Sequence, residues 1–417
     1  MRIMKRIVIV VGGVETLEYF AYQMGKTFEK EGYLTFYFDL KDVTESAKRL
    51  KKFNRYGETA LLTFNFEGLS QEIGIYKSGK GYIWEEYLIP CYNIAVDHPY
   101  YYHKRLAKLP KEYYHISIDR KHEAYFKKFY PEYNHFGFLP LAGTMLEDDL
   151  DVEKSVGEDH SRVNANGAGM LKTALAENRM MDVIMTGNYT PLSFSEPHIH
   201  RIDEEYAEFY QGIIDELINE PHKTLEEVAM AHCRDELGEV SNEGVRLVLH
   251  NMIFIDLYIR SYWRGEVVKT LVDAGIHVDV FGKGWEELNC DKRKMEQFLH
   301  IHPQTTSLVC LQQIKQAKVS LNVMPWFKDG AHDRVFNSIL NGTVCVTDKS
   351  IYLCDELKDG EGVCYYELDK LKLLPERVLW LLNSESQRQE IIEKGLKRVN
   401  PYHTWDDRAR QLINWLQ

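Results

Sequence analysis

Residues suited to chemistry gather at one strand-to-helix junction, the segment VSLNVMPWFKDGAHDRVFNSILNGTVCVTD at 319–348. The apolar run 319–323 predicts a strand, and a helical pattern over 331–340 follows Asp329-Gly330. Free N–H groups at a helix N-terminus attract anions, the Arg334 guanidinium matches phosphate oxygens, and Gly330 would allow close approach. An ordinary turn with a solvated arginine is the alternative. The predicted diphosphate cradle comprises Asp329, Gly330, Ala331, His332 and Arg334.

Three other loops follow predicted strands and contain glycine, at 12–13, 187–189 and 282–285. In open α/β folds, ligands bind at the carboxyl ends of the strands, so these loops are candidates for ligand contact. Each is equally well interpreted as a simple turn. The first loop lacks GxGxxG, which disfavours a dinucleotide-dependent dehydrogenase. The candidate residues are Gly12, Gly187, Asn188, Gly282, Lys283 and Trp285.

Histidine pairs and one acidic run raise the question of a metal site. Neither His198-x-His200 nor His300-x-His302 has a third ligand at helical or hairpin spacing. The run Asp148-Asp149-Leu150-Asp151 lies in a polar, acidic stretch at 147–169 and is typical of a solvated linker. We predict no metal site and no cofactor.

The composition is that of a globular protein, with 44% hydrophobic and 27% charged residues in 417 positions. The net charge of −12 argues against a nucleic-acid binder, although a local basic pocket for an anion stays possible. Seven cysteines without a CxxC motif indicate reduced thiols and a cytoplasmic location. No run reaches the roughly 18 apolar residues of a membrane helix.

Strand and helix patterns alternate along the chain, which predicts an α/β protein with parallel sheets. Strands are expected at 7–11, 33–40, 60–65, 92–96, 115–118, 181–186, 276–281, 319–323 and 343–347. Helices are expected at 15–30, 203–219, 224–237, 245–274, 307–316 and 331–340. We predict two Rossmann-like domains facing each other across a cleft, with an N-terminal domain at 1–178, a C-terminal domain at 179–400 and a final helix at 401–417.

The junction at 319–348, together with NPYHTWDDRARQLINWL at 400–416, resembles the spore-maturation CgeB-like branch of the group 1 glycosyltransferases. The matching positions are Asp329, Gly330, His332, Arg334, Phe336, Gly342, Thr347, Asp348, His403, Thr404, Trp405 and Arg408. Looser similarity covers 63–70, Trp84, Ile89-Pro90, 96–99, 117–131 and 139–143. We expect Thr404 to cap the final helix and Trp405 to be a packing residue.

This resemblance implies a GT-B fold and transfer of a sugar from a nucleotide-diphosphate sugar to an unidentified acceptor, such as a protein or surface glycan. It implies a metal-independent and retaining reaction, with diphosphate contacts from Arg334 and donor-sugar contacts from Asp97 or His98. A turn fixed by Pro99 is the alternative for that loop. Asn337 stands where related enzymes use an acidic residue for the donor ribose. A sugar-nucleotide epimerase and a non-catalytic coat-associated protein remain alternatives.

Overall fold

The first domain is built on a sheet of six parallel strands in the order β2-β1-β3-β6-β7-β8. The structure is a computed structural model that describes residues 4–146 and 179–417. The β-branched strand β1 is buried from Ile7 to Val11, as expected for a strand between two parallel neighbours. The strands are β1 Arg6–Val11, β2 Leu34–Asp39, β3 Thr59–Phe64, β6 Cys91–Ala95, β7 Tyr113–Ser117 and β8 Asn134–Phe138. The main helices are α1 Glu15–Lys30, α2 Val43–Phe53 and α5 Arg120–Phe129.

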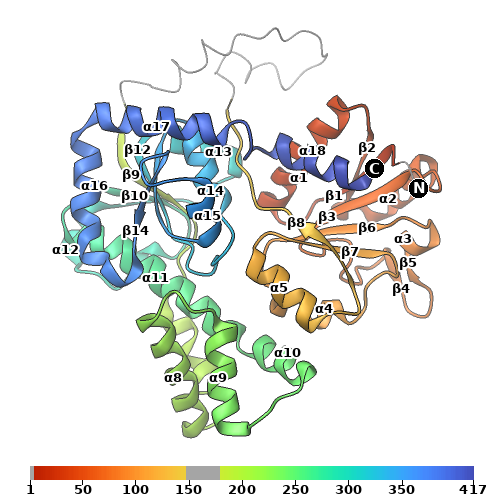
Figure 1. Ribbon diagram of the computed structural model, residues 1–417, viewed down its shortest axis with the longest axis horizontal. Coiled ribbons are helices and arrows are strands. Elements are labelled where there is room, and N and C mark those ends of the chain that lie inside the picture. Colours follow the sequence, from red (N-terminus) through yellow and green to blue (C-terminus); the bar gives the residue numbers. More distant parts are fainter. Residues whose placement is uncertain (1–3, 147–178) are drawn as a thin grey trace.

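The second domain repeats this plan with six parallel strands in the order β11-β10-β9-β12-β13-β14 (Figure 1). Its strands are β9 Met181–Thr186, β10 Val278–Phe281, β11 Leu299–His302, β12 Ala317–Asn322, β13 Val344–Asp348 and β14 Val363–Tyr366. The packed helices are α11 Ile253–Asp273, α13 Ser307–Lys315, α14 Asp333–Leu340, α15 Ile351–Glu356, α16 Leu374–Asn383 and α17 Glu385–Val399. The predicted α/β class with two parallel-sheet domains is confirmed.

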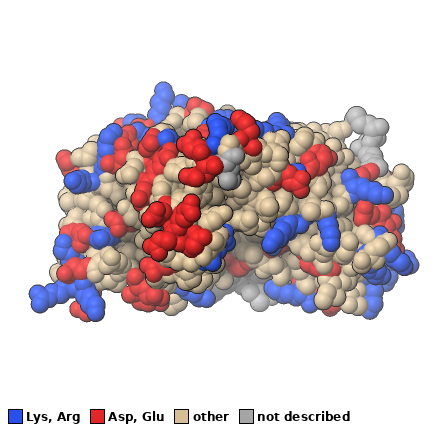
Figure 2. Space-filling model, turned by 90° about the horizontal axis from the view of Figure 1, so that it is seen from below, with Lys and Arg blue, Asp and Glu red and all other residues tan. Residues whose placement is uncertain are grey.

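A group of helices stands between β9 and α11 and extends below both sheets (Figure 1). It comprises α8 Glu204–Asn219, α9 Leu225–Leu237 and α10 Asn242–Asn251. Helix α10 contacts the first domain, where His250 Nδ1 lies 3.1 Å from the Tyr100 carbonyl and Arg246 pairs with Glu132 at 2.9 Å. Seen from below, acidic side chains gather near the centre of the molecule (Figure 2). Such a surface repels polyanions.

The last helix, α18 Trp405–Leu416, returns to the first domain and lies along α1 (Figure 1). The Trp405 ring centroid lies 4.4 Å from that of Phe20, and Arg410 pairs with Glu31 at 3.0 Å. Thr404 Oγ1 accepts a hydrogen bond from the Asp407 N–H at 3.2 Å. The predicted helix cap at Thr404 and the packing role of Trp405 are therefore confirmed.

Three expectations about individual elements need correction. The helix predicted at 245–274 is two helices, because Met252 ends α10 and a new axis begins at Ile253. The helix predicted to begin at Ala331 begins at Asp333, and His332 is its N-cap. The edge strands β8, β11 and β14 lie outside the predicted strands. None of the helices within 4–146 and 179–417 combines the length and apolar character of a membrane span.

Candidate functional site

The Asp329-Gly330 loop lies against the first domain. The Asp329 N–H donates to Asp119 Oδ2 at 2.9 Å, and Arg120 Nη1 lies 3.3 Å from Asp329 Oδ1. A side-chain carbon at Gly330 would lie 2.8 Å from the Ile118 carbonyl oxygen. The glycine does serve a close backbone approach, but in this structure the approaching group is the first domain and not a phosphate. Ala331, next in the loop, is fully buried.

Arg334 extends from the first turn of α14 toward the end of β9. Its Nη2 lies 2.9 Å from His332 Nε2, and a side-chain carbon at Gly187 would lie 3.6 Å from the same Nη2. The guanidinium is buried, with 8% of the residue exposed, and its Nη1 has no hydrogen-bond partner. Burial lowers the pKa of His332, so its ring is neutral beside the guanidinium. The Arg334 guanidinium thus lies next to Gly187 and has an unused N–H group at Nη1.

Two arginines on one face of α11 extend this positive charge. Arg264 donates to the Asn188 carbonyl oxygen, and its Nε is buried without a partner. Arg260 and Arg264 stack on Trp326, with their Cζ atoms 4.6 Å and 5.5 Å from the ring centroid. Burial, with Arg334 and Arg260 as like charges, lowers the pKa of Arg264 to about 9. Arg260, Arg264 and Arg334 form the arginine cluster. Arg260 is paired with Asp256 and Asp97, whereas the buried Arg264 and Arg334 each keep a nitrogen without a partner, which favours a bound anion.

The two glycine loops of the second domain pack on each other beside this cluster. Asn188 Oδ1 accepts a hydrogen bond from the Lys283 N–H at 2.9 Å, and a side chain at Gly282 would overlap the Gly187 carbonyl. Trp285 is 0% exposed, and its indole N–H donates to the Gly187 carbonyl at 2.8 Å. Trp285, a candidate for ligand contact, is a core residue whose ring supports the loop. Lys283 is exposed.

On the first-domain side, Asp97 lies at the carboxyl end of β6. Asn65 Nδ2 and the Tyr102 hydroxyl donate to its Oδ2 at 3.2 Å and 3.0 Å. Its Oδ1 faces Arg260 Nη1 at 3.5 Å, which joins Asp97 to the arginine cluster. Asn65 and Phe66 have φ values of 46° and 63°, and such backbone strain is concentrated at functional sites. The strained turn directs the Asn65 amide at the Asp97 carboxylate.

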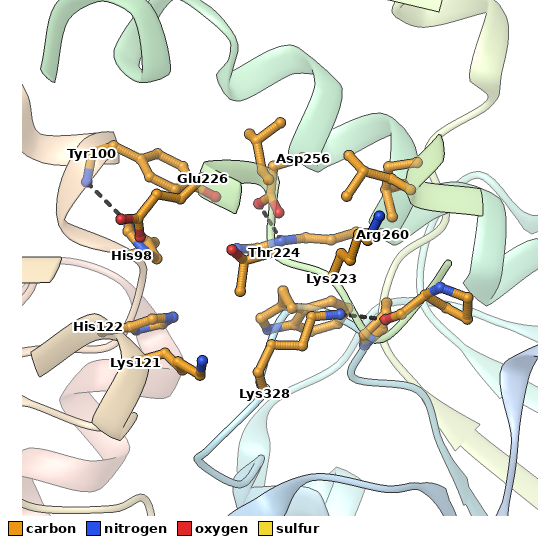
Figure 3. Close-up of a pocket in the computed structure, with 16 residues that line it drawn as sticks. His98, Tyr100, Lys121, His122, Lys223, Thr224, Glu226, Asp256, Arg260 and Lys328 are labelled. Carbon is orange, nitrogen blue, oxygen red and sulfur yellow. Dashed lines mark hydrogen bonds and ion pairs between the residues drawn. The ribbon is translucent and has the colours of Figure 1, made fainter. Parts of the chain in front are cut away.

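His98, the other predicted donor contact, is a buried wall residue. Its Nδ1 accepts a hydrogen bond from the Tyr100 N–H at 3.4 Å, and its ring lies 4.5 Å from that of His122. Burial, with His122 nearby, holds the pKa of His98 well below its usual value, so the ring is neutral. Both histidines line a cavity of about 40 Å³ between the domains (Figure 3).

Residues 263–414, all in the second domain and the final helix, match the family described as glycosyl transferase-like. The whole chain is similar in structure to sucrose-phosphate synthase from Thermosynechococcus elongatus, with a TM-score of 0.52, 8% identity and 98% of both chains covered. It is also similar to the β-glucosyltransferase of T4 phage, with a TM-score of 0.51, 12% identity and 99% of both chains covered. The fold is GT-B.

Two further comparisons complete this result. The GT-B chain spans 57% of the length of TarM, with a TM-score of 0.46 and 10% identity. No curated protein sequence matches it at a significant level. The family match covers residues 263–414, the similar structures show the fold, and the comparisons identify neither an acceptor nor a sugar.

The remaining predicted residues, Gly12 and Asn337, have contacts inside the protein. Gly12 has a φ of 88°, and a side chain there would overlap Asp39 Oδ1, so its glycine serves a tight turn. Asn337 Oδ1 accepts a hydrogen bond from the Thr144 N–H at 2.8 Å, and its Nδ2 donates to Asp333 Oδ2 at 2.9 Å. The Asn337 amide therefore ties the segment leaving the first domain to α14.

The structure places Arg334 next to Gly187 and Asn188. Asp97 is connected to this group by its contact with Arg260. It adds four residues that the sequence did not indicate, namely Asn65, Arg260, Arg264 and Trp326. Within the described ranges, no group of three or more histidine, cysteine or acidic side chains could hold a metal ion. The acidic run at 148–151 lies outside the described residues.

Proposed function

We propose that this protein transfers a glycosyl group from a nucleoside-diphosphate sugar to an acceptor hydroxyl. The observation that carries the proposal is the arginine cluster, in which buried Arg264 Nε and Arg334 Nη1 lack partners beside the Gly187-Asn188 loop. A diphosphate supplies the acceptor oxygens that these groups need. The glycosyl transferase-like match over 263–414 includes both residues.

In the proposed reaction, the bond from the anomeric carbon to the diphosphate oxygen breaks and a bond to the acceptor oxygen forms. Negative charge develops on the leaving diphosphate, where the arginine cluster stabilises it more than in the ground state. Because fixed guanidinium groups supply this charge, we propose a metal-independent reaction. The nucleotide is the leaving group and no other cofactor takes part.

Asp97 is our proposed acceptor of the proton that the attacking hydroxyl loses. Two donors hold Oδ2, whereas Oδ1 has only the longer contact with Arg260 Nη1 at 3.5 Å, so Oδ1 is the oxygen proposed to take the proton. A positioned carboxylate base favours a single displacement with inversion, whereas the CgeB-like resemblance implies retention. The anomeric configuration of the product, measured by NMR, distinguishes the two outcomes.

For the donor, we propose a uridine nucleotide, since a β-glucosyltransferase of the same fold takes uridine diphosphoglucose as its substrate; that structure has a TM-score of 0.51 and 11% identity. We also propose membership of the CgeB-like branch and a cytoplasmic location, where the seven unpaired cysteines would stay reduced. The acceptor is a protein or glycan hydroxyl.

A thermal-shift screen with UDP, GDP, dTDP, CDP and ADP tests the donor site. A ligand that binds the folded state alone raises the melting temperature by mass action. We expect one diphosphate to raise it with EDTA present, and Arg334→Gln to abolish that shift. An unchanged melting temperature with all five would contradict the proposal. Turnover of a nucleotide sugar without any acceptor would indicate an epimerase.

A further inference from the structure

The cavity beside Asp97 is lined by both domains and by the helical group between β9 and α11 (Figure 3). Its volume of about 40 Å³ is roughly three times the minimum that one water needs. Sites for whole nucleotides or drug-sized ligands measure several hundred Å³, so this cavity suits a single small group such as a phosphate or carboxylate. Its charged lining residues are Lys121, Lys223, Glu226, Asp256, Arg260 and Lys328.

Among the described residues, Lys328 is a cationic wall residue without a direct ion pair. Its Nζ donates to the Pro221 carbonyl at 2.5 Å, and no carboxylate of the described residues lies within ion-pair distance. Burial lowers the pKa of Lys328 to about 8, and the negative charges of nearby acidic side chains, with Asp348 first, only partly offset this effect. A desolvated ammonium without a counter-ion is costly, and an anion in the cavity would supply the counter-ion.

The other basic wall residues are paired. Lys223 Nζ lies 2.8 Å from both Glu216 and Glu220, and Arg260 Nε lies 2.7 Å from Asp256 Oδ2. Lys121 Nζ lies 3.5 Å from Glu227 Oε1. The unpaired charge is therefore local to Lys328 and is not a general property of the basic side chains around the cavity.

On the facing wall, His122 offers an unused nitrogen. The residue is 3% exposed, and its Nδ1 is buried without a hydrogen-bond partner. Figure 3 shows its ring extending from α5 toward the side on which Lys328 lies. A buried imidazole nitrogen without a partner costs free energy, and an anionic oxygen would satisfy it once the nitrogen carries a proton.

We propose that this cavity binds a small anionic group of the acceptor, a phosphate monoester or a carboxylate, between Lys328 and His122. The assignment to the acceptor rests on the proposed glycosyl transfer. Asp97 directly precedes the cavity residue His98, and Arg260 contacts Asp97 while lining the cavity. An acceptor anchored here by its anionic group would therefore present a hydroxyl near Asp97.

Isothermal titration of the full chain with inorganic phosphate tests the site without any sugar donor. We expect Lys328→Gln to weaken phosphate binding at least tenfold and His122→Phe to weaken it severalfold. Lys223→Gln is the matched control, because that lysine lines the same cavity with two carboxylate partners, and it should change the affinity less than threefold. A crystal soaked with tungstate gives a second readout should a variant fold poorly, with density expected between Lys328 and His122.

Equal phosphate affinity in wild type and Lys328→Gln would overturn the proposal, as would a loss of binding caused by Arg264→Met instead. Glycerol 3-phosphate and acetate distinguish the source of the anion. Binding of either at least as tight as that of phosphate supports a group carried by the acceptor, and binding of free phosphate alone overturns that assignment. The nucleotide thermal shift should survive Lys328→Gln, so failure here is distinguishable from failure of the proposed transferase activity.

Discussion

Arg264→Met separates binding from folding at the arginine cluster. Arg264 donates to the Asn188 carbonyl, stacks on Trp326 and holds a buried Nε without a partner. A hydrogen bond to a charged group contributes about 1.5–3 kcal/mol. The loss of one such bond to a diphosphate raises Kd about 10- to 150-fold, because about 1.4 kcal/mol corresponds to a factor of ten. The assay is titration of wild type and variant with the diphosphate selected by the screen.

The same substitution should not destabilise the free protein. Burial and two neighbouring arginines lower the pKa of Arg264 to about 9. Below that pH the buried positive charge lowers the free energy of unfolding, and substitution by methionine removes this destabilising charge. The melting temperature of the nucleotide-free variant should therefore equal or exceed that of wild type. Arg201→Met, which removes a cation–π contact with Phe254 outside the cluster, is the matched control and should bind normally. An unchanged Kd in Arg264→Met, or a melting temperature that falls together with affinity, would refute the reasoning.

Three other substitutions test the catalytic carboxylate, the domain contact and a buried acid. Asp97→Asn should lower kcat about 100- to 10,000-fold while the donor Kd changes less than threefold; an unaffected kcat would exclude Asp97 as the base. Asp119→Ala removes the acceptor of three backbone N–H groups, on Lys121, His122 and Asp329, and should lower the free energy of unfolding in urea by about 2–4 kcal/mol. Asp42→Ala, at a cap with one such bond, should cost about 1 kcal/mol, and equal losses would contradict the domain-contact role. Burial raises the pKa of Asp348 to about 7, so the folded state retains its proton where the unfolded state loses it, and stability falls from pH 4 to pH 7. Asp348→Asn removes this component, and its stability relative to wild type in urea should rise over that range; a constant difference would be the contrary result.

Local patterns predicted the elements that position the site. The predicted bounds 15–30 and 181–186 coincide with α1 and β9, because a glycine pair precedes the first and a β-branched run marks the second. The break at Met252 carries no glycine or proline. It arises from packing, because α10 contacts helices of the first domain whereas α11 packs against β10 in the second domain. No local rule predicts a helix end that tertiary contacts impose.

Site residues could be predicted from the sequence only where charged side chains come shortly after the end of a predicted strand. Arg334 and Asp97 fit that rule. Arg260 and Arg264 lie within an apolar helical pattern, and nothing local indicates that their face meets Asn188, which is 76 residues away from Arg264. Trp285 follows a strand and was therefore a candidate for ligand contact. Its burial against Tyr189 and the Gly187 carbonyl depends on residues about 100 positions away, which no local pattern indicates. At Gly330 the sequence predicted close approach of a phosphate, and the group that lies against this glycine in the structure belongs to the other domain.

The return of α18 to α1 bears on the order in which the chain acquires structure during synthesis. Domains generally fold as units while the ribosome adds residues. Here Phe20, Thr27 and Glu31 meet their partners only when Trp405, Asp406 and Arg410 have emerged, after the entire second domain. The part of α1 that α18 covers must therefore stay exposed while the second domain folds. A nascent chain stalled just before residue 405 would accordingly be an aggregation-prone species, even with both parallel sheets complete.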